Sequence, residues 1–293
     1  MSQRALFYAR FAVGIVAVSF GAILVRLAGE APALAIAGWR LAFTAAVLAP
    51  LAPFRRSLWR IPRREALLSV ASGAALAVHF ILWITSLQYT TVASSVLFVT
   101  THPIFVGLGA RFLFKERWSR GLVLGMALAL LGGGLIGFGD LGVGGDALRG
   151  DLLALGGGFA VAVYFLIGRH VRKTVSVIDY ITITYGTAAV IVLLTCLIAR
   201  CPLTGYTTST YLFLALLALG PQLVGHSTFN WALKHLPASQ VSAMILAEPI
   251  GSTLLALLFF GETPTWLNGI GAVIILLGIY WTQRIKEASD DRN

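Results

Sequence analysis

The chain has 293 residues, of which 58% are hydrophobic and only 12% are charged, and its mean hydropathy is +0.85. Soluble domains carry about 25% charged residues, so this composition excludes an ordinary water-soluble fold. A formal net charge of +10 would suit a nucleic-acid binder, but the basic residues lie between apolar runs instead of forming a polar face. We therefore expect an all-α membrane protein whose surroundings are the lipid bilayer, with no nucleic acid as a partner.

Ten apolar segments are long enough to cross a bilayer as helices, which takes about 20 residues. Their approximate limits in chain order are 9–28, 33–53, 65–86, 91–113, 120–139, 151–170, 177–199, 209–230, 238–260 and 265–283. The first follows two basic residues, as in a signal peptide, but equal apolar stretches come after it, so we interpret it as a spanning helix. The connections are short, and the sequence predicts a single membrane domain over 1–293.

The basic residues between the spans predict the orientation, because Lys and Arg collect on the cytoplasmic side of membrane proteins. With the N-terminus inside, most of the 22 Lys and Arg residues lie in cytoplasmic segments. Arg26, Arg149 and Arg200 fall on the opposite side, and Arg40 lies within the second span. We expect a multi-pass protein of the bacterial inner membrane with both termini in the cytoplasm.

The third to fifth spans match the eighth to tenth when they are aligned without a gap. Pro103 then meets Pro249, and Glu116 meets Glu262, both rare residue types in membrane helices. The same alignment pairs Gly125 with Gly271 and Gly132 with Gly278. Each half, 1–145 and 146–293, holds five spans, so the second half enters the membrane from the opposite face. Two inverted five-helix repeats are typical of secondary transporters, although a duplication without transport stays open.

The second half contains motifs at fixed places along its spans. They are the run ALKHLPASQVSA over 232–243, the pair Glu248–Pro249 and the pair Gly261–Glu262. A weaker copy in the first half consists of LQYTTVASS over 87–95, His102–Pro103 and Lys115–Glu116, in which His102 and Lys115 depart from the usual residues. These motifs resemble the drug/metabolite transporter superfamily in its ten-helix EamA-type branch.

This resemblance implies a transporter that moves a small molecule and uses no cofactor. Within the family, YddG-type exporters of aromatic amino acids supply the substrate class that we expect, with aromatic and other apolar amino acids as the substrate. The motifs do not fix the substrate, so a multidrug or other metabolite transporter stays open. Two inverted halves in one chain predict a functional monomer.

Candidate substrate-binding residues are aromatic, thioether or polar side chains inside the spans. They are His79, Trp83, Phe98, His102, Tyr164, Asn230 and Met244, with His226 as a further candidate. His79 and Trp83 are four residues apart and so share a helix face. A histidine in an apolar helix needs a hydrogen-bond partner, which a water-filled cavity supplies. An aromatic and thioether lining suits an apolar amino acid, while packing or lipid contact is the alternative.

Arg40 and Glu248 are the oppositely charged residues deep inside spans, where charges are costly and face a cavity or a partner. Arg40 would bind a carboxylate, and Glu248 an amine or a proton. The alternative makes each a packing anchor near an interface, and Glu248 directly precedes a helix-bending proline. Pro103, Pro221 and Pro249 are the predicted hinges of an alternating-access mechanism.

Other site types find little support in the sequence. Cys196 and Cys201 are the two cysteines and lie where a span runs out into a loop, so neither a metal site nor a disulfide framework is indicated and we expect free thiols. An intramembrane enzyme would need a Ser/His pair, a carboxylate dyad or a histidine cluster at matched depth. We keep it as a remote alternative and expect a non-enzyme.

Overall fold

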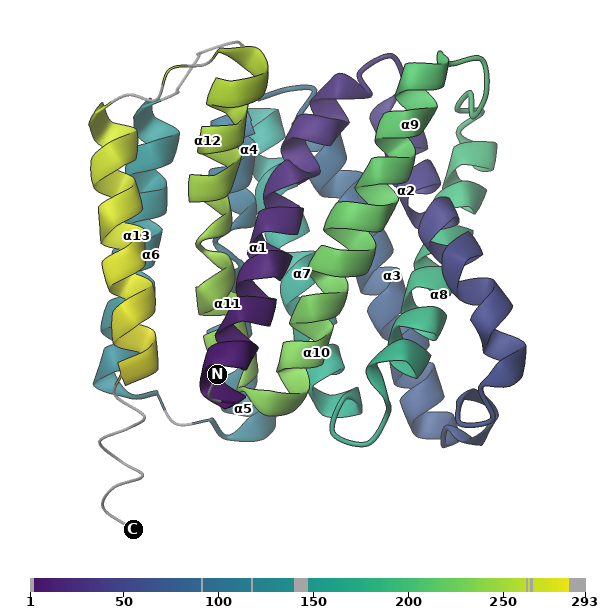
Figure 1. Ribbon diagram of the computed structural model, residues 1–293, viewed down its shortest axis with the longest axis horizontal. Helices are drawn as coiled ribbons and strands as arrows, with labels where there is room; N and C mark the ends of the chain where they lie inside the picture. Colours follow the sequence, from purple (N-terminus) through teal and green to yellow (C-terminus); the bar gives the residue numbers. More distant parts are fainter. Residues whose placement is uncertain are drawn as a thin grey trace.

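The computed structural model describes residues 3–90, 92–116, 118–139, 147–261, 263 and 266–284, and this part of the chain is helical without strands (Figure 1). The helices of the first half are α1 (Gln3–Leu27), α2 (Ala33–Leu48), α3 (Arg63–Ser86), α4 (Val92–Val99), α5 (His102–Phe114) and α6 (Arg120–Gly139), with short 3-10 turns η1 (Ala49–Phe54) and η2 (Leu58–Arg60). Those of the second half are α7 (Ala147–Val171), α8 (Val177–Ile198), α9 (Thr208–Leu217), the π-helix η3 (Ala218–His226), α10 (Ser227–His235), α11 (Ala238–Ile245), α12 (Glu248–Phe260) and α13 (Trp266–Arg284).

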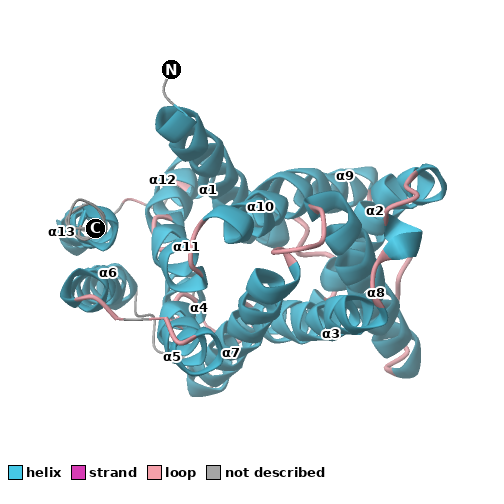
Figure 2. Cartoon of the chain, turned by 90° about the horizontal axis from the view of Figure 1, so that it is seen from below, coloured by secondary structure: helices cyan, strands magenta, loops and turns pink. Residues whose placement is uncertain are grey.

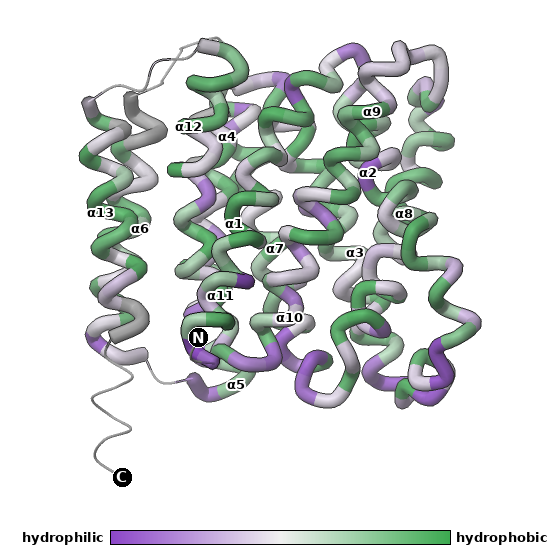
Figure 3. Tube along the Cα trace, viewed as in Figure 1, coloured by the Kyte–Doolittle hydropathy of each residue, from purple (hydrophilic) through white to green (hydrophobic). Residues whose placement is uncertain are grey.

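These helices coincide with the predicted spans. Seven helical stretches of the described chain are long and apolar enough to cross a membrane, and the shorter apolar helices His102–Phe114, Arg120–Leu135 and Gly269–Trp281 fall in the other three spans. Large apolar side chains point outward, such as Phe112 at 79% and Leu258 at 76% exposed, while polar residues gather at the helix ends (Figure 3). An outward apolar surface is what a bilayer solvates. The prediction of an all-α membrane protein of ten spans is confirmed.

Two spans that the sequence analysis treats as continuous are broken in the middle. The fourth consists of α4 and α5, and the ninth of α11 and α12. In each case the second helix has a proline as its second residue, Pro103 in α5 and Pro249 in α12. Proline lacks an N–H, and its ring clashes with the carbonyl four residues earlier, so the preceding helix ends there. The two breaks fall at matching positions of the two repeats.

The eighth span has a different irregularity. Between α9 and α10 the chain forms the π-helix η3, which contains Pro221. A π-helical turn is wider than an α-helical turn and occurs mostly as a short insertion at functional sites. The three prolines predicted as hinges therefore all lie at departures from the regular α-helix, although their role as hinges is not tested by this geometry.

The contact between α6 and α13 relates the two halves by an approximate twofold axis. A Cβ added at Gly132 would lie 2.4 Å from the Gly271 carbonyl oxygen, and one added at Gly278 would lie 2.5 Å from that of Gly125. Since Gly125 corresponds to Gly271 and Gly132 to Gly278, these are the same contact made twice. The helices lie side by side at one end of the molecule in both views (Figures 1 and 2). Glycines permit this close approach in membranes.

The repeat alignment therefore holds for the glycines, and two inverted five-helix repeats describe the fold. The Glu116–Glu262 correspondence cannot be followed, because Glu262 lies outside the described residues. The division of the chain into 1–145 and 146–293 stays a prediction.

We expect Gly132→Ala to lower the stability of the protein, because its new methyl group would press on the backbone of α13. The loss should be about 1–3 kcal/mol, as for other overpacked sites. Gly134→Ala is the matched control, since a Cβ at Gly134 meets nothing within 4 Å. Thermal unfolding of the purified protein in detergent measures both variants, and an equal melting temperature for the two would contradict the packing described here.

Candidate functional site

A cavity of about 50 Å³ lies at the level of the two helix breaks. Its lining residues come from both halves of the chain, and they are Val18, Gly21, Arg40, His79, Phe80, Trp83, Val99, Thr100, His102, Val161, Phe165, Pro221, His226, Phe229, Ile245 and Glu248. A cavity needs about 10–15 Å³ to hold one water molecule, so this cavity has room for a few waters. Pockets for drug-sized ligands occupy about 300–1,000 Å³. The cavity is therefore smaller than a pocket for a drug-sized ligand.

Arg40 is the cation of the cavity. It projects from α2, is 1% exposed, and donates from Nε to Gln222 Oε1 at 2.8 Å. Its Cζ lies 4.0 Å from the centre of the Phe80 ring, a cation–π contact. Within the described part of the chain, no carboxylate forms an ion pair with Arg40, and its terminal nitrogens make no hydrogen bond. Gln222 thus holds one edge of the guanidinium, and the terminal nitrogens of Arg40 are left to donate to a ligand.

Glu248 supplies the carboxylate of the cavity from the first turn of α12. Its side chain is half-buried and makes no hydrogen bond or ion pair to any described residue. His102, at the equivalent place in α5, also lines the cavity. Both side chains lie where a broken helix restarts, and the partial positive charge of a helix N-terminus favours an anion there. The two sequence-equivalent positions therefore bring a carboxylate and an imidazole to the same space.

Three ring nitrogens of residues that line the cavity lack partners among the described residues. Trp83 Nε1, His102 Nε2 and His226 Nδ1 are buried and form no hydrogen bond with the described residues. Most buried polar atoms in proteins are satisfied, so such a group calls for a ligand or an ordered water. His102 Nδ1 lies 3.2 Å from the Val99 carbonyl oxygen, which leaves its Nε2 free.

His79 differs from these residues because it is already anchored. Its Nδ1 donates to the Gly157 carbonyl oxygen at 3.0 Å, which joins α3 to α7. Its ring is parallel to that of Trp83, with 6.1 Å between the centroids. His79 thereby holds the indole in place at the cavity wall.

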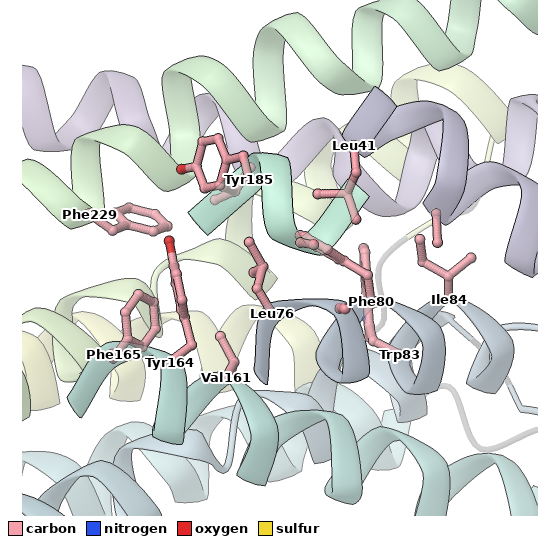
Figure 4. Packing of buried hydrophobic residues seen from close by; sticks show 14 of the residues in the cluster. Leu41, Leu76, Phe80, Trp83, Ile84, Val161, Tyr164, Phe165, Tyr185 and Phe229 are labelled. Carbon is pink, nitrogen blue, oxygen red and sulfur yellow. The ribbon is translucent and has the colours of Figure 1, made fainter. Parts of the chain in front are cut away.

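Aromatic rings next to these groups form part of the cavity wall. Phe165 of α7 and Phe229 of α10 pack with their centroids 6.5 Å apart, and His102 lies 5.8 Å from Phe165. Figure 4 shows Phe165, Tyr164 and Phe229 turned toward one another, with Phe80 and Trp83 on the neighbouring helix. The wall is apolar and rigid, and it suits a flat hydrophobic group.

The remaining predicted site residues lie behind or beside the cavity. Asn230 Nδ2 donates to the hydroxyls of Tyr164 and Tyr185, and this buried cluster joins α7, α8 and α10. Phe98 is half-buried and Met244 is buried, but neither is among the residues that line the cavity. The structure brings together Arg40, Glu248, His79, Trp83 and His102, along with Pro221, whereas Pro103 and Pro249 sit at the helix breaks.

The sequence analysis missed several residues at or near the cavity. Phe80, Phe165 and Phe229 line it, and Gln222 orients Arg40. A signal for Gln222 was present, since it is a polar residue inside an apolar span and precedes His226 by four residues. The phenylalanines carried no signal, because many others in the spans face lipid or the packed interior.

Polar contacts close the molecule at the end opposite the termini. Glu30, between α1 and α2, accepts hydrogen bonds from Thr210 Oγ1 at 2.8 Å, from Thr207 N at 3.1 Å and from Thr207 Oγ1 at 2.9 Å. These donors hold the pKa of the Glu30 carboxyl below its usual value. They tie the α1–α2 loop to the start of α9.

Arginine contacts close the end that carries the termini. The hydrogen bond from Arg55 Nε to Asp179 Oδ1, at 2.5 Å, raises the pKa of Arg55, and Arg55 also donates to Ser176 Oγ at 3.0 Å. Arg169 Nη1 donates to the Leu233 carbonyl oxygen at 2.6 Å, and Arg172 Nε to that of Asn230 at 3.0 Å. Polar contacts thus join helices at both ends of the molecule.

Comparisons with known proteins agree with this architecture. A model of the EamA-like transporter family matches residues 4–138 and 148–283. The uncharacterized transporter YdfC of Bacillus subtilis (strain 168) is 28% identical over 191 residues, which cover 64% of this chain and 60% of YdfC. YyaM, an uncharacterized transporter of the same organism, is 24% identical over 255 residues, covering 83% of this chain and 82% of YyaM.

The similarity extends to a human protein and to a solved structure. Solute carrier family 35 member G1 of Homo sapiens is 22% identical over 271 residues, covering 88% of this chain and 73% of that protein. One protein crystal structure superposes with a TM-score of 0.78 at 20% identity, covering 95% of this chain and 97% of the other. At this identity the superposition shows a shared fold.

Replacing the amide that holds Arg40 should destabilise the protein. We expect Gln222→Leu to lower its stability by about 1–3 kcal/mol, because Arg40 Nε would lose its acceptor in a buried site. Gln240→Leu is the control, since Gln240 is a buried amide whose Oε1 has no partner among the described residues. Thermal unfolding in detergent compares them, and a Gln222→Leu protein as stable as the control would mean that the Arg40 contact contributes little.

Proposed function

The chain belongs to the EamA-like transporter family, and we propose that it is a secondary transporter that exports small metabolites, above all aromatic and other apolar amino acids. The observation that carries this proposal is that two opposite charges without an ion-pair partner share a cavity with an aromatic wall. Arg40 and Glu248 line one cavity without forming an ion pair to each other, and Phe165 and Phe229 face the same space. An amino acid offers a complement to each of these groups.

The fit follows from the chemistry of a zwitterion. A substrate carboxylate would accept hydrogen bonds from the terminal nitrogens of Arg40, whose flat guanidinium suits two-pronged contacts. The ammonium group would lie against the Glu248 carboxylate. A side chain without charge would then contact the phenylalanine rings and the indole of Trp83. Each substrate group would replace water at a protein group that is costly to leave without a partner in a membrane.

The mechanism that we propose is alternating access in an inner-membrane monomer with both termini in the cytoplasm. The helix breaks at His102–Pro103 and Glu248–Pro249 let the half-helices α5 and α12 move separately from α4 and α11. Opening at one end requires release of the Glu30 contacts, and opening at the other requires release of the Arg169 and Arg172 contacts. Inverted repeats give the two gates related structures.

A transporter of drugs or other metabolites is the second candidate. Glu248 alone would suffice for a cationic drug, and the aromatic wall would accept its rings. Such a substrate would leave Arg40 without a partner and close to the added positive charge. A substrate that carries a carboxylate therefore uses more of the cavity than a simple cation does.

Neutralising either charge should reduce amino-acid transport. We expect Arg40→Gln and Glu248→Gln each to lower uptake of an aromatic amino acid into proteoliposomes about tenfold or more, the equivalent of a lost charge-assisted hydrogen bond of about 1.5–3 kcal/mol. Arg64→Gln and Glu65→Gln, at the start of α3 and outside the cavity lining, are the matched controls. Full activity in both cavity variants would refute the proposed binding mode.

The choice of substrate can be tested with the same vesicles. We expect labelled aromatic and other apolar amino acids to enter above the level of empty vesicles, and charged amino acids to enter poorly. Trp83→Ala should reduce uptake of aromatic substrates more than uptake of alanine, because it removes part of the aromatic wall. Entry of a cationic dye without entry of any amino acid would leave the family assignment intact and favour the second candidate.

A further inference from the structure

The C-terminal end of α8 forms a Schellman motif that contains both cysteines of the chain. Cys201 N donates to the Cys196 carbonyl oxygen at 2.8 Å, and Arg200 N donates to that of Leu197 at 3.1 Å. Arg200 adopts the left-handed conformation that ends such a helix, with φ of 50°. These two hydrogen bonds and the left-handed residue define the motif.

The motif determines which side chains meet. Its two outer residues, here Cys196 and Cys201, frequently touch through their side chains, because the longer hydrogen bond folds the chain back on the last helical turn. In this structure both are free thiols, and the 2.8 Å hydrogen bond from Cys201 N to the Cys196 carbonyl oxygen brings the two residues together. Cys196 is buried and Cys201 is half-buried, so one thiol of the pair is accessible from outside. The spacing of the cysteines alone does not reveal this contact.

We propose that Cys196 and Cys201 form a disulfide when this end of the protein meets an oxidising compartment. The α8–α9 loop lies at the end of the molecule opposite the start of α1 and the end of α13 (Figure 1). With cytoplasmic termini, as in the proposed function, this face is outside the cytoplasm, where disulfides form and persist. Geometry and location thus favour the same bond.

The reaction needs an oxidant, which is a protein disulfide of the thiol-oxidase class. The Cys201 thiolate attacks one oxidant sulfur and releases the other as a thiolate. The Cys196 thiolate then attacks Cys201 Sγ, and the second oxidant sulfur leaves. The two protons lost by the cysteines end on the two oxidant sulfurs, so one disulfide is exchanged for another.

The bond would fix the outer end of α2 through contacts that already exist. Cys196 Sγ lies 3.4 Å from the Leu34 carbonyl oxygen, and the loop that follows Cys201 accepts a hydrogen bond from Trp39 Nε1 at its Leu203 carbonyl, 2.8 Å away. Trp39 directly precedes Arg40 in α2. A disulfide would hold this loop on α2 and keep the left-handed turn at Arg200 closed.

The test is a count of reactive thiols in the full-length protein purified from aerobically grown cells without reductant. After denaturation, a maleimide reagent should label neither cysteine, and after reduction it should label both. The unreduced protein should also be lighter by two hydrogen atoms in intact mass and run as a monomer on a non-reducing gel. Cys201→Ser and Cys196→Ser should each show one reactive thiol with or without reductant.

A second readout follows the consequence for stability. Reductant should lower the melting temperature of the wild-type protein by several degrees, in line with a small closed loop, and leave that of Cys201→Ser unchanged. Two reactive thiols in the unreduced wild-type protein, persisting after treatment with oxidised glutathione, would overturn the proposal. These measurements do not involve transport, so failure of the disulfide and failure of the proposed function are distinguished.

Discussion

The backbone of a membrane protein must satisfy its own hydrogen bonds, because hydrocarbon offers none, and the rest of this structure depends on that constraint. Regular helices meet it along most of the chain. Irregular backbone is tolerated only where it borders a cavity or is buried in protein. The breaks before Pro103 and Pro249 and the π-helix around Pro221 all adjoin the same cavity. The positions of three prolines therefore decide where the site lies.

The same constraint explains the polar residues of the site. A buried charge or ring nitrogen needs a partner, and in the described residues some find one inside the protein while others do not. Gln222 satisfies one nitrogen of Arg40, and Gly157 satisfies His79. The indole N–H of Trp83, the Nδ1 atom of His226 and the carboxylate of Glu248 have no such partner. The first group sets the geometry, and the second group is left for a bound molecule or for water.

Much of the fold could be predicted from the sequence because the length of an apolar run is a direct measure of a span. Site residues were predictable where a polar type stands out against an apolar background, as with Arg40, His79, His102 and Glu248. Phe80, Phe165 and Phe229 could not be predicted, because the sequence does not distinguish an apolar residue that faces a cavity from one that faces another helix or lipid. Phe98 and Met244 were expected at the cavity as aromatic and thioether side chains, but neither lines it, and each lies in the half-helix before a break, α4 or α11.

The two halves resemble each other more closely in their backbones than in the side chains at the cavity. The glycine contacts of α6 and α13 and the two helix breaks repeat between the halves, whereas His102 in the first half stands where the second half has Glu248. The π-helix also belongs to one half only, since the equivalent part of α3 is a regular helix. A symmetric backbone with unlike side chains places one polar site between two related helix breaks. The substrate that we propose, with a carboxylate at one end and an amine at the other, would suit that kind of site.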